Sequence, residues 1–171
     1  MPRSVFPPAT IIPWLAYTRS LTEKLNALTG DARLDVLHQS WDKPNSWDKK
    51  VLFLDCDQVM HREIAMWSLD SVCWYARTIL PISTYQSNKA LFERLQNESL
   101  GQLIFNSQQI ERLSLTHYAI SPDSIEYSWL NSNFHEDAPI LWVRLSEFQV
   151  NHDSSFYLVE ILLPGLLRCL S

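Results

Sequence analysis

The segment REIAMWSLDSVCWYARTILPIS, residues 62–83, constrains the fold more than any other part of the sequence. Two runs rich in apolar, aromatic and β-branched residues flank a turn at Leu69–Asp70, which is typical of a β-hairpin. Near the C-terminus, ILWVRLSEFQV and SSFYLVEILLP flank the turn residues NHDS in the same way. Two such hairpins predict an antiparallel sheet.

Shorter segments predict the remaining elements. TRSLTEKLNALTG predicts a helix, because Ser20 can cap its start, Glu23 stands at the capping-box position and Gly30 can end it. Alternation predicts strands in RLDVLHQSW and ERLSLTHYAI, and helical spacing predicts a helix in NKALFERLQNES. We interpret three segments as irregular or extended: DKPNSWDKK as a turn, VLFLDCDQV as extended chain, and SPDSIEYSWLNSNFHEDAP as a polar excursion. The predicted fold class is α+β.

Length and composition limit the class of protein. The 171 residues, 46% of them hydrophobic, suffice for one domain with its own core, spanning residues 1–171. Prolines interrupt residues 1–13, which we expect to form an irregular N-terminal arm. The net charge is −5 and no Lys/Arg-rich run occurs, so we expect no nucleic-acid partner. No apolar run reaches the about 20 residues of a membrane span, and three glycines exclude a glycine-rich phosphate loop.

The cysteines and the N-terminus favour a cytoplasmic protein. Cys56, Cys73 and Cys169 are odd in number and far apart, which argues against a disulfide framework and against a zinc site. Free thiols fit a reducing compartment. The N-terminal segment also lacks the long apolar core of a signal peptide.

The first hairpin carries two arginines, Arg62 and Arg77. If Ser68 faces Ser71 across the turn, these arginines lie directly opposite each other and point to the same side of the sheet. Like charges in that position repel unless water screens them or anions lie between them. Because guanidinium groups match the two oxygens of a carboxylate, the pair predicts a site for an acidic ligand.

The second hairpin carries a glutamate in apolar surroundings. Glu160 alternates with Leu158 and Leu162, so its side of the strand is otherwise apolar. An ionised carboxylate in such a place needs a partner, or its pKa rises. An arginine is the natural partner, and a carboxyl group with a raised pKa can act as a proton donor.

The residues alone leave two interpretations open. In one, Arg62 and Arg77 lie on a solvated face and Glu160 forms a structural ion pair; in the other, all three form a ligand site. Neither the aspartates of DCD nor the histidines have metal-ligand spacing. We expect the histidines to be structural or exposed, with His61 pointing to the face opposite Arg62; they are His38, His61, His117, His135 and His152.

Four blocks in the same order resemble bacterial chorismate lyases, also called chorismate–pyruvate lyases. Residues 62–83 resemble the family's R-E-I…W…R-T-V-x-P-x-S, and LGQLIFNS resembles L-G-x-x-L-F-x-S. ILWVRLSEF…FYLVEILLP resembles W-x-R-x-S…L-x-E-x-F-L-P, and RSLTEKL resembles a helix start with S-M-T. Together the blocks cover the helix near residue 20 and most of residues 59–164.

The resemblance implies a twisted antiparallel sheet whose helices close over a buried ligand site. It implies conversion of chorismate to 4-hydroxybenzoate and pyruvate, which supplies the head group of prenylated quinones such as ubiquinone or plastoquinone. It also implies a monomer that uses no metal or organic cofactor, with the substrate and product as its only partners.

The resemblance also assigns roles to five positions. Arg62 matches the arginine that binds the ring carboxylate, and Arg77 is expected near the enolpyruvyl carboxylate. Glu160 matches the glutamate expected to hydrogen-bond the ring hydroxyl, so Glu160 and Arg62 are the expected catalytic residues. Leu100 and Leu21 match positions that bind the ligand carboxylate through backbone N–H groups.

Two departures and two alternatives remain. Leu21 replaces a methionine of the family, which affects the shape of the pocket more than its chemistry, and Ala76 stands where a glycine often precedes the second arginine. Effector-binding domains of some bacterial transcription regulators share this architecture and bind small acids without chemistry. We expect the first 30 or so residues to be too few for a winged helix in front of such a domain. An inactive relative that only holds 4-hydroxybenzoate is the weaker alternative.

Overall fold

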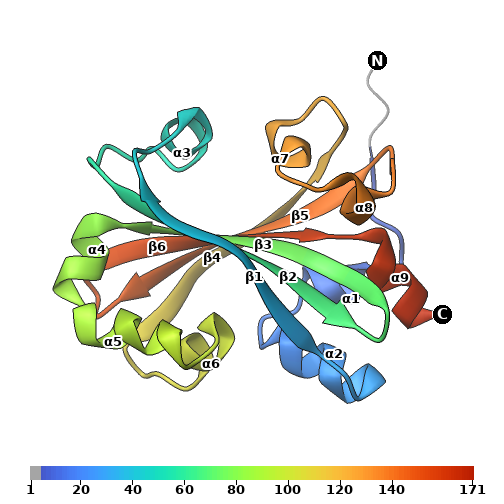
Figure 1. Ribbon diagram of the computed structural model, residues 1–171, viewed down its shortest axis with the longest axis horizontal. Coiled ribbons are helices and arrows are strands. Elements are labelled where there is room, and N and C mark those ends of the chain that lie inside the picture. Colours follow the sequence, from blue (N-terminus) through green and yellow to red (C-terminus); the bar gives the residue numbers. More distant parts are fainter. Residues whose placement is uncertain (1–4) are drawn as a thin grey trace.

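The computed structural model describes residues 5–171, and its centre is a twisted six-stranded sheet in the order β1-β2-β3-β6-β5-β4 (Figure 1). All neighbouring strands in this order run antiparallel, which confirms the predicted α+β class with an antiparallel sheet. The strands are β1 (Arg33–Asp42), β2 (Val59–Ser68), β3 (Ser71–Pro81), β4 (Ile110–Ile120), β5 (Leu141–Val150) and β6 (Ser154–Leu162).

Helices cover both sides of the sheet (Figure 1). Trp47 and Tyr127, from α3 and α7, pack in one apolar core, whereas Leu25 of α2 and Leu103 of α6 belong to cores on the other side. We call these two sides the α3/α7 face and the α2/α6 face. The helices are α1 (Ile12–Leu15), α2 (Leu21–Thr29), α3 (Ser46–Val51), α4 (Ile82–Ser87), α5 (Lys89–Glu93), η1 (Arg94–Gln96, a 3₁₀ turn), α6 (Leu100–Phe105), α7 (Ile125–Ser128), α8 (Ser132–His135) and α9 (Pro164–Leu170).

The predicted first hairpin is confirmed, but its register shifts along its length. Ser68 faces Ser71 across the turn, as predicted. Further from the turn, Cys73 of β3 has no partner on β2, so this strand contains one extra residue. Such a β-bulge moves every later pair by one position, and a one-residue shift exchanges the two faces of a strand.

The prediction that Arg62 lies opposite Arg77 is therefore wrong. Beyond the bulge, Arg62 pairs with Thr78, and Arg77 pairs with Glu63. Residues directly opposite each other share a face, so Arg62 points to the α2/α6 face and Arg77 to the α3/α7 face. The two cations do not repel across the hairpin, because the bulge separates them.

The predicted first helix is confirmed as α2. The Ser20 hydroxyl accepts a hydrogen bond from the Glu23 N–H at 3.2 Å, and Gly30 ends the helix with a φ of 77°. This left-handed conformation favours glycine, which has no Cβ to clash. Strand β1 is also confirmed, but nearly all of it is exposed because it forms an edge of the sheet.

Several short helices were not predicted. DKPNSWDKK contains α3, which begins with a capping box between Asn45 and Asp48, and VLFLDCDQV is mostly loop before β2 begins at Val59. LGQLIFNS forms α6, the polar excursion contains α7 and α8, and α9 follows β6. The described part of the N-terminal arm leads into α1, and residues 1–4 of that arm lie outside the described residues. Within residues 5–171, no helix is long and apolar enough to cross a membrane.

Candidate active site

A cavity lies between the α2/α6 face of the sheet and the beginnings of α2 and α6. Its open space is about 70 Å³. Four of the five predicted site residues line it, although they come from distant parts of the chain: Leu21, Arg62, Leu100 and Glu160. The fifth, Arg77, does not. Apolar side chains of the sheet form much of the remaining wall, among them Ile64, Met66, Trp74 and Leu158.

Arg62 places a buried positive charge in this cavity. The residue is only 5% exposed, and its guanidinium has no hydrogen-bond or ion-pair partner among residues 5–171. Burial lowers the pKa of Arg62, with no nearby carboxylate to offset it. A buried cation without a partner is costly for the fold, so an anionic ligand is the simplest explanation for keeping it.

Glu160, in contrast, has an arginine partner, as predicted from its apolar surroundings in the sequence. The Arg144 Nε donates to a Glu160 carboxylate oxygen at 3.1 Å. The remaining donors of Arg144 bond the backbone carbonyls of Trp14, Leu15 and Tyr17. All three nitrogens of this fully buried guanidinium therefore donate hydrogen bonds, and the ion pair holds the Glu160 carboxylate at the wall of the cavity.

Sequence reasoning did not assign Arg144, although the second hairpin contains the necessary information. The pair Val150–Ser154 closes the turn, and counting back along both strands places Arg144 opposite Glu160. No bulge interrupts this hairpin, so a count from the NHDS turn would have identified the pair.

Two helix starts contribute backbone donors to the same cavity. Leu21 and Leu100 are the first residues of α2 and α6, where N–H groups have no partner within the helix. The caps Ser20 and Ser99 accept from the N–H groups of Glu23 and Gln102, three residues further on, and so leave those of Leu21 and Leu100 free. The two starts are adjacent, because a Cβ added to Gly101 would lie 3.8 Å from the Ser20 Oγ.

Arg77 is paired on the opposite face of the sheet. Its Nη2 donates to Glu63 at 3.0 Å and its Nε donates to the Tyr75 hydroxyl at 3.1 Å. Its guanidinium carbon lies 3.9 Å from the centre of the Trp129 ring. The expected role of Arg77 at the ligand is thus at odds with its position, since the sheet itself separates it from the cavity.

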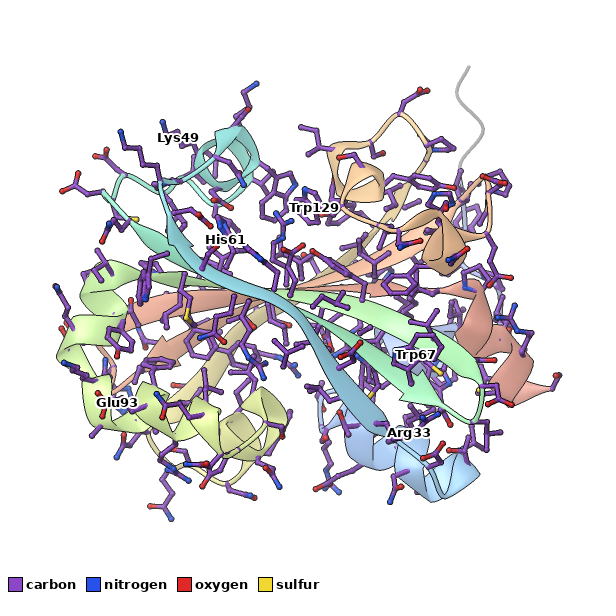
Figure 2. The ribbon with its side chains drawn as sticks, in the orientation of Figure 1. Arg33, Lys49, His61, Trp67, Glu93 and Trp129 are labelled. Atoms are coloured by element: carbon purple, nitrogen blue, oxygen red, sulfur yellow. The ribbon has the colours of Figure 1, made fainter. Side chains whose placement is uncertain are left out.

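His61 also lies on the α3/α7 face, as predicted. Figure 2 shows it on the same side of the sheet as Trp129. Its two ring nitrogens lie 2.8 Å from Asp48 and 3.0 Å from Asp42. Burial disfavours the charged imidazole, but the hydrogen bonds to Asp48 and Asp42 outweigh it, so the pKa of His61 is raised. This cluster holds α3 and the end of β1 against β2.

The α2/α6 cavity can therefore bind a small acid. Arg62 and the free N–H groups of Leu21 and Leu100 can hold one carboxylate. The apolar wall suits a ring, and the fixed carboxylate of Glu160 can accept a hydrogen bond or a proton from the ligand.

Comparison with known proteins points to one family. The family model described as chorismate lyase matches residues 3–166. A protein of Psychromonas ingrahamii named "Probable chorismate pyruvate-lyase" is 26% identical over 157 residues, which cover 91% of this chain and 83% of that protein. A protein of Shewanella with the same name is 29% identical over 177 aligned positions, covering 96% and 86%. The "Chorismate pyruvate-lyase" of Pectobacterium atrosepticum is 26% identical over 61% of this chain and 63% of its own.

Solved structures with a similar fold include proteins named as a repressor and as transcriptional regulators. PhnF of Mycobacterium smegmatis superimposes with a TM-score of 0.60 at 17% identity, covering 87% of this chain and 65% of PhnF. The C-terminal domain of the histidine utilization repressor of Pseudomonas syringae gives a TM-score of 0.54 at 10% identity, covering 78% and 92%. At such identities the likeness concerns the fold alone.

Proposed function

The chain belongs to the chorismate lyase family, and we propose that it is an enzyme converting chorismate to 4-hydroxybenzoate and pyruvate. One observation carries the proposal: the unpaired cation of Arg62 and the arginine-held carboxylate of Glu160 line the same cavity. The names of the relatives agree with this activity.

The ring carboxylate of chorismate would bind at Arg62. Its guanidinium can donate two hydrogen bonds to one carboxylate, and the N–H groups of Leu21 and Leu100 can add one each. The product 4-hydroxybenzoate carries the same carboxylate, so it would bind there too. Because β2, α2 and α6 fix the backbone positions of these donors, the donors keep their arrangement when a ligand enters.

Glu160 would contact the other end of the ring. A carboxylate held by Arg144 can accept a hydrogen bond from the ring hydroxyl. In the reaction the bond between the ring and the ether oxygen breaks, the hydroxyl-bearing carbon loses its hydrogen, and the ring becomes aromatic. Aromatisation provides much of the driving force, so the protein chiefly orients the substrate and stabilises the charge that develops.

Two routes for the hydrogen remain open. It can pass directly to the enolpyruvyl methylene through a cyclic arrangement, which completes the methyl group of pyruvate. Alternatively, this hydrogen leaves as a proton to solvent while Glu160 acts as a general acid–base at the hydroxyl group, and the released enolpyruvate takes its methyl proton from water. A deuterium label on the hydroxyl-bearing carbon separates the two routes, because only direct transfer carries it quantitatively into the pyruvate methyl group.

The cavity must widen to admit the substrate. Its open space of about 70 Å³ is smaller than the about 150 Å³ of a cavity that binds benzene. The exposed residues Arg19 and Phe105 line it, and movement of such side chains can open it. Closure around the ligand would exclude water and strengthen the contacts to Arg62.

The cellular setting is part of the proposal. We expect a monomer in the cytoplasm that supplies a quinone head group. The three cysteines are free thiols, which fits a reducing compartment. Analytical ultracentrifugation of the purified protein tests whether it is a monomer in solution.

A second candidate function is a binding domain that senses a small acid without chemistry. The likeness in fold to transcription regulators favours it, and the same cavity would hold the acid.

Release of pyruvate from chorismate tests the proposed lyase activity. Purified protein is mixed with chorismate, pyruvate is followed with lactate dehydrogenase, and 4-hydroxybenzoate is measured by chromatography. We expect equal amounts of both products, and a loss of at least about 100-fold in kcat/KM for Arg62→Ala and Glu160→Ala.

Arg94→Ala provides a matched control, because Arg94 forms an exposed ion pair with Glu98. It should leave turnover unchanged. Binding of 4-hydroxybenzoate by the unmodified protein without any pyruvate would favour the sensor instead.

A further inference from the structure

The charges that line the cavity do not balance. Four arginines face one carboxylate, that of Glu160. Arg144 is paired with this carboxylate, so the two charges cancel. Arg19 is largely exposed at the rim, where water screens it. Two positive charges therefore remain for a ligand, those of Arg62 and Arg112.

Arg112 has donors that the protein does not use. Its Nη1 donates to the Thr18 carbonyl at 2.8 Å, and its guanidinium lies against the Phe148 ring at 5.0 Å. Its Nε is buried and has no hydrogen-bond partner among the described residues. No carboxylate of residues 5–171 lies within ion-pair distance of it. Burial and the nearby charge of Arg144 lower the pKa of Arg112, and together they outweigh the Glu160 carboxylate, which raises it.

Arg112 approaches the cavity from the side opposite Arg62. It lies on β4 at one edge of the sheet, whereas Arg62 lies on β2, with β3, β6 and β5 between them. Four strand spacings separate the two backbones by about 19 Å in a flat sheet. Both side chains line the cavity, so they can contact opposite ends of a ligand within it.

We propose that Arg112 binds the second carboxylate of the substrate, the enolpyruvyl carboxylate of chorismate. This rests on the proposed function, and it moves to Arg112 the role that the sequence had suggested for Arg77. Two uncompensated arginines match the two carboxylates of the dianion, and guanidinium suits each of them. Because 4-hydroxybenzoate has one carboxylate, Arg112 distinguishes the substrate from the product.

Arg112→Gln tests this inference through the difference between two ligands. The variant should raise the KM for chorismate about 10- to 100-fold but change the Kd for 4-hydroxybenzoate less than about twofold. Arg112→Lys should raise the KM for chorismate less than Arg112→Gln does. Lysine keeps the positive charge but lacks the paired N–H donors of a guanidinium group. Arg62→Gln should weaken both ligands, because both carry the ring carboxylate.

Arg94→Gln is the control for a surface arginine, and circular dichroism melting reports whether each variant folds. An unchanged KM for chorismate in Arg112→Gln overturns the inference. An equal loss for both ligands also overturns it, because a general disturbance of the cavity, transmitted through Thr18, would produce that result.

The outcome remains separate from that of the proposed function. If the unmodified protein releases no pyruvate, the Kd for chorismate is measured directly by calorimetry. A selective loss of chorismate binding in Arg112→Gln then supports the second carboxylate site although the lyase is disproved. Failure of the unmodified protein to bind either ligand overturns both proposals.

Discussion

The cavity contains two buried arginines in opposite situations. Arg144 is surrounded by acceptors, from Glu160 and from the carbonyls of Trp14, Leu15 and Tyr17 at the end of α1. Removing it would leave a buried carboxylate unpaired, which costs about 3–5 kcal/mol. Arg62 has no such partner, so its partial desolvation costs stability that an anionic ligand would offset. One arginine therefore supports the fold and the other is available for binding.

Replacing Arg62 should lower catalytic activity but increase the stability of the fold. Arg62→Met keeps the length of the side chain and removes the unpaired charge. We expect the free energy of unfolding to rise by about 0.5–2 kcal/mol, while kcat/KM for chorismate falls at least about 100-fold. Urea titration and the pyruvate assay measure the two effects. The exposed replacement Arg94→Met should change neither, and a less stable Arg62→Met would contradict this account of its burial.

At the scale of elements, α9 packs against the hairpin near its bulge. The Leu163 N–H donates to the Cys73 carbonyl at 2.9 Å, just before α9 begins. Gly165 then passes so close to β3 that a Cβ on it would lie 2.0 Å from the Val72 carbonyl oxygen. The approach of two backbones, rather than a turn, requires glycine here.

Gly165→Ala should therefore destabilise the protein. Either α9 or β3 must move, at a cost of about 1–3 kcal/mol, which lowers Tm by roughly 2–4 °C for each kcal/mol in a domain of this size. Gly101→Ala is the matched control, because its added Cβ would make only ordinary contacts at 3.8 Å or more. Calorimetry compares the two, and equal Tm values would refute the close packing of α9.

The beginnings of α2 and α6 are a second element-scale feature. Each is capped by a serine whose bond leaves the N–H of the first helical residue free, and both first residues, Leu21 and Leu100, line the cavity. Because the two starts are adjacent, a carboxylate between them could reach both donors.

Ligand binding should protect these amides. We expect 4-hydroxybenzoate to slow hydrogen exchange of the Leu21 and Leu100 amides by about tenfold, since a new hydrogen bond must open before exchange. NMR measures individual amides. Those of Ser46 and Trp47, at the start of α3 on the opposite face, serve as the control. If 4-hydroxybenzoate binds tightly but does not slow exchange of the Leu21 and Leu100 amides, these amides do not bind the ligand.

In the whole molecule, the two faces of the sheet differ in how their charged side chains are paired. On the α3/α7 face, the charged groups are paired: Arg77 bonds Glu63 and Tyr75, and His61 bonds two aspartates. Two atoms of α3, Trp47 Nε1 and Asp48 Oδ1, are buried there without a partner within residues 5–171. On the α2/α6 face, donors of Arg62 and Arg112 remain without partners among the described residues. The unpaired cations that line a cavity are therefore on the α2/α6 face.

The His61 cluster should make stability depend on pH. Its pKa is raised in the folded protein above the about 6.5 of an unfolded chain. The stabilisation is thus fully present below about pH 6.5 and is lost as pH rises through the folded-state pKa. Each unit of difference in pKa is worth about 1.4 kcal/mol. Urea midpoints between pH 6 and 9 should fall with rising pH.

His61→Gln should flatten this pH dependence, whatever it does to absolute stability, because no titrating group then lies between Asp48 and Asp42. His152→Gln, in the exposed turn before β6, should leave the dependence intact. The same slope in His61→Gln would assign the effect to another group.

Much of the site could be predicted from the sequence. The blocks around Arg62, Glu160, Leu21 and Leu100 indicated residues that the fold brings to one cavity. Arg77 was misplaced because the bulge at Cys73 leaves no local pattern in the sequence. Arg112 was not singled out, since nothing near it on β4 distinguishes it from any arginine on an edge strand.

The sequence by itself determined the strands, the two hairpin turns and the capped helix α2, because hydrophobic period, turn residues and caps act over a few neighbouring positions. Only the tertiary structure decided which arginines share a cavity. That choice depends on strand order and on single-residue shifts of register, and each such shift turns a side chain to the other face of the sheet. We attribute these shifts of strand register to the packing of helices such as α9 against the sheet, rather than to local sequence preference.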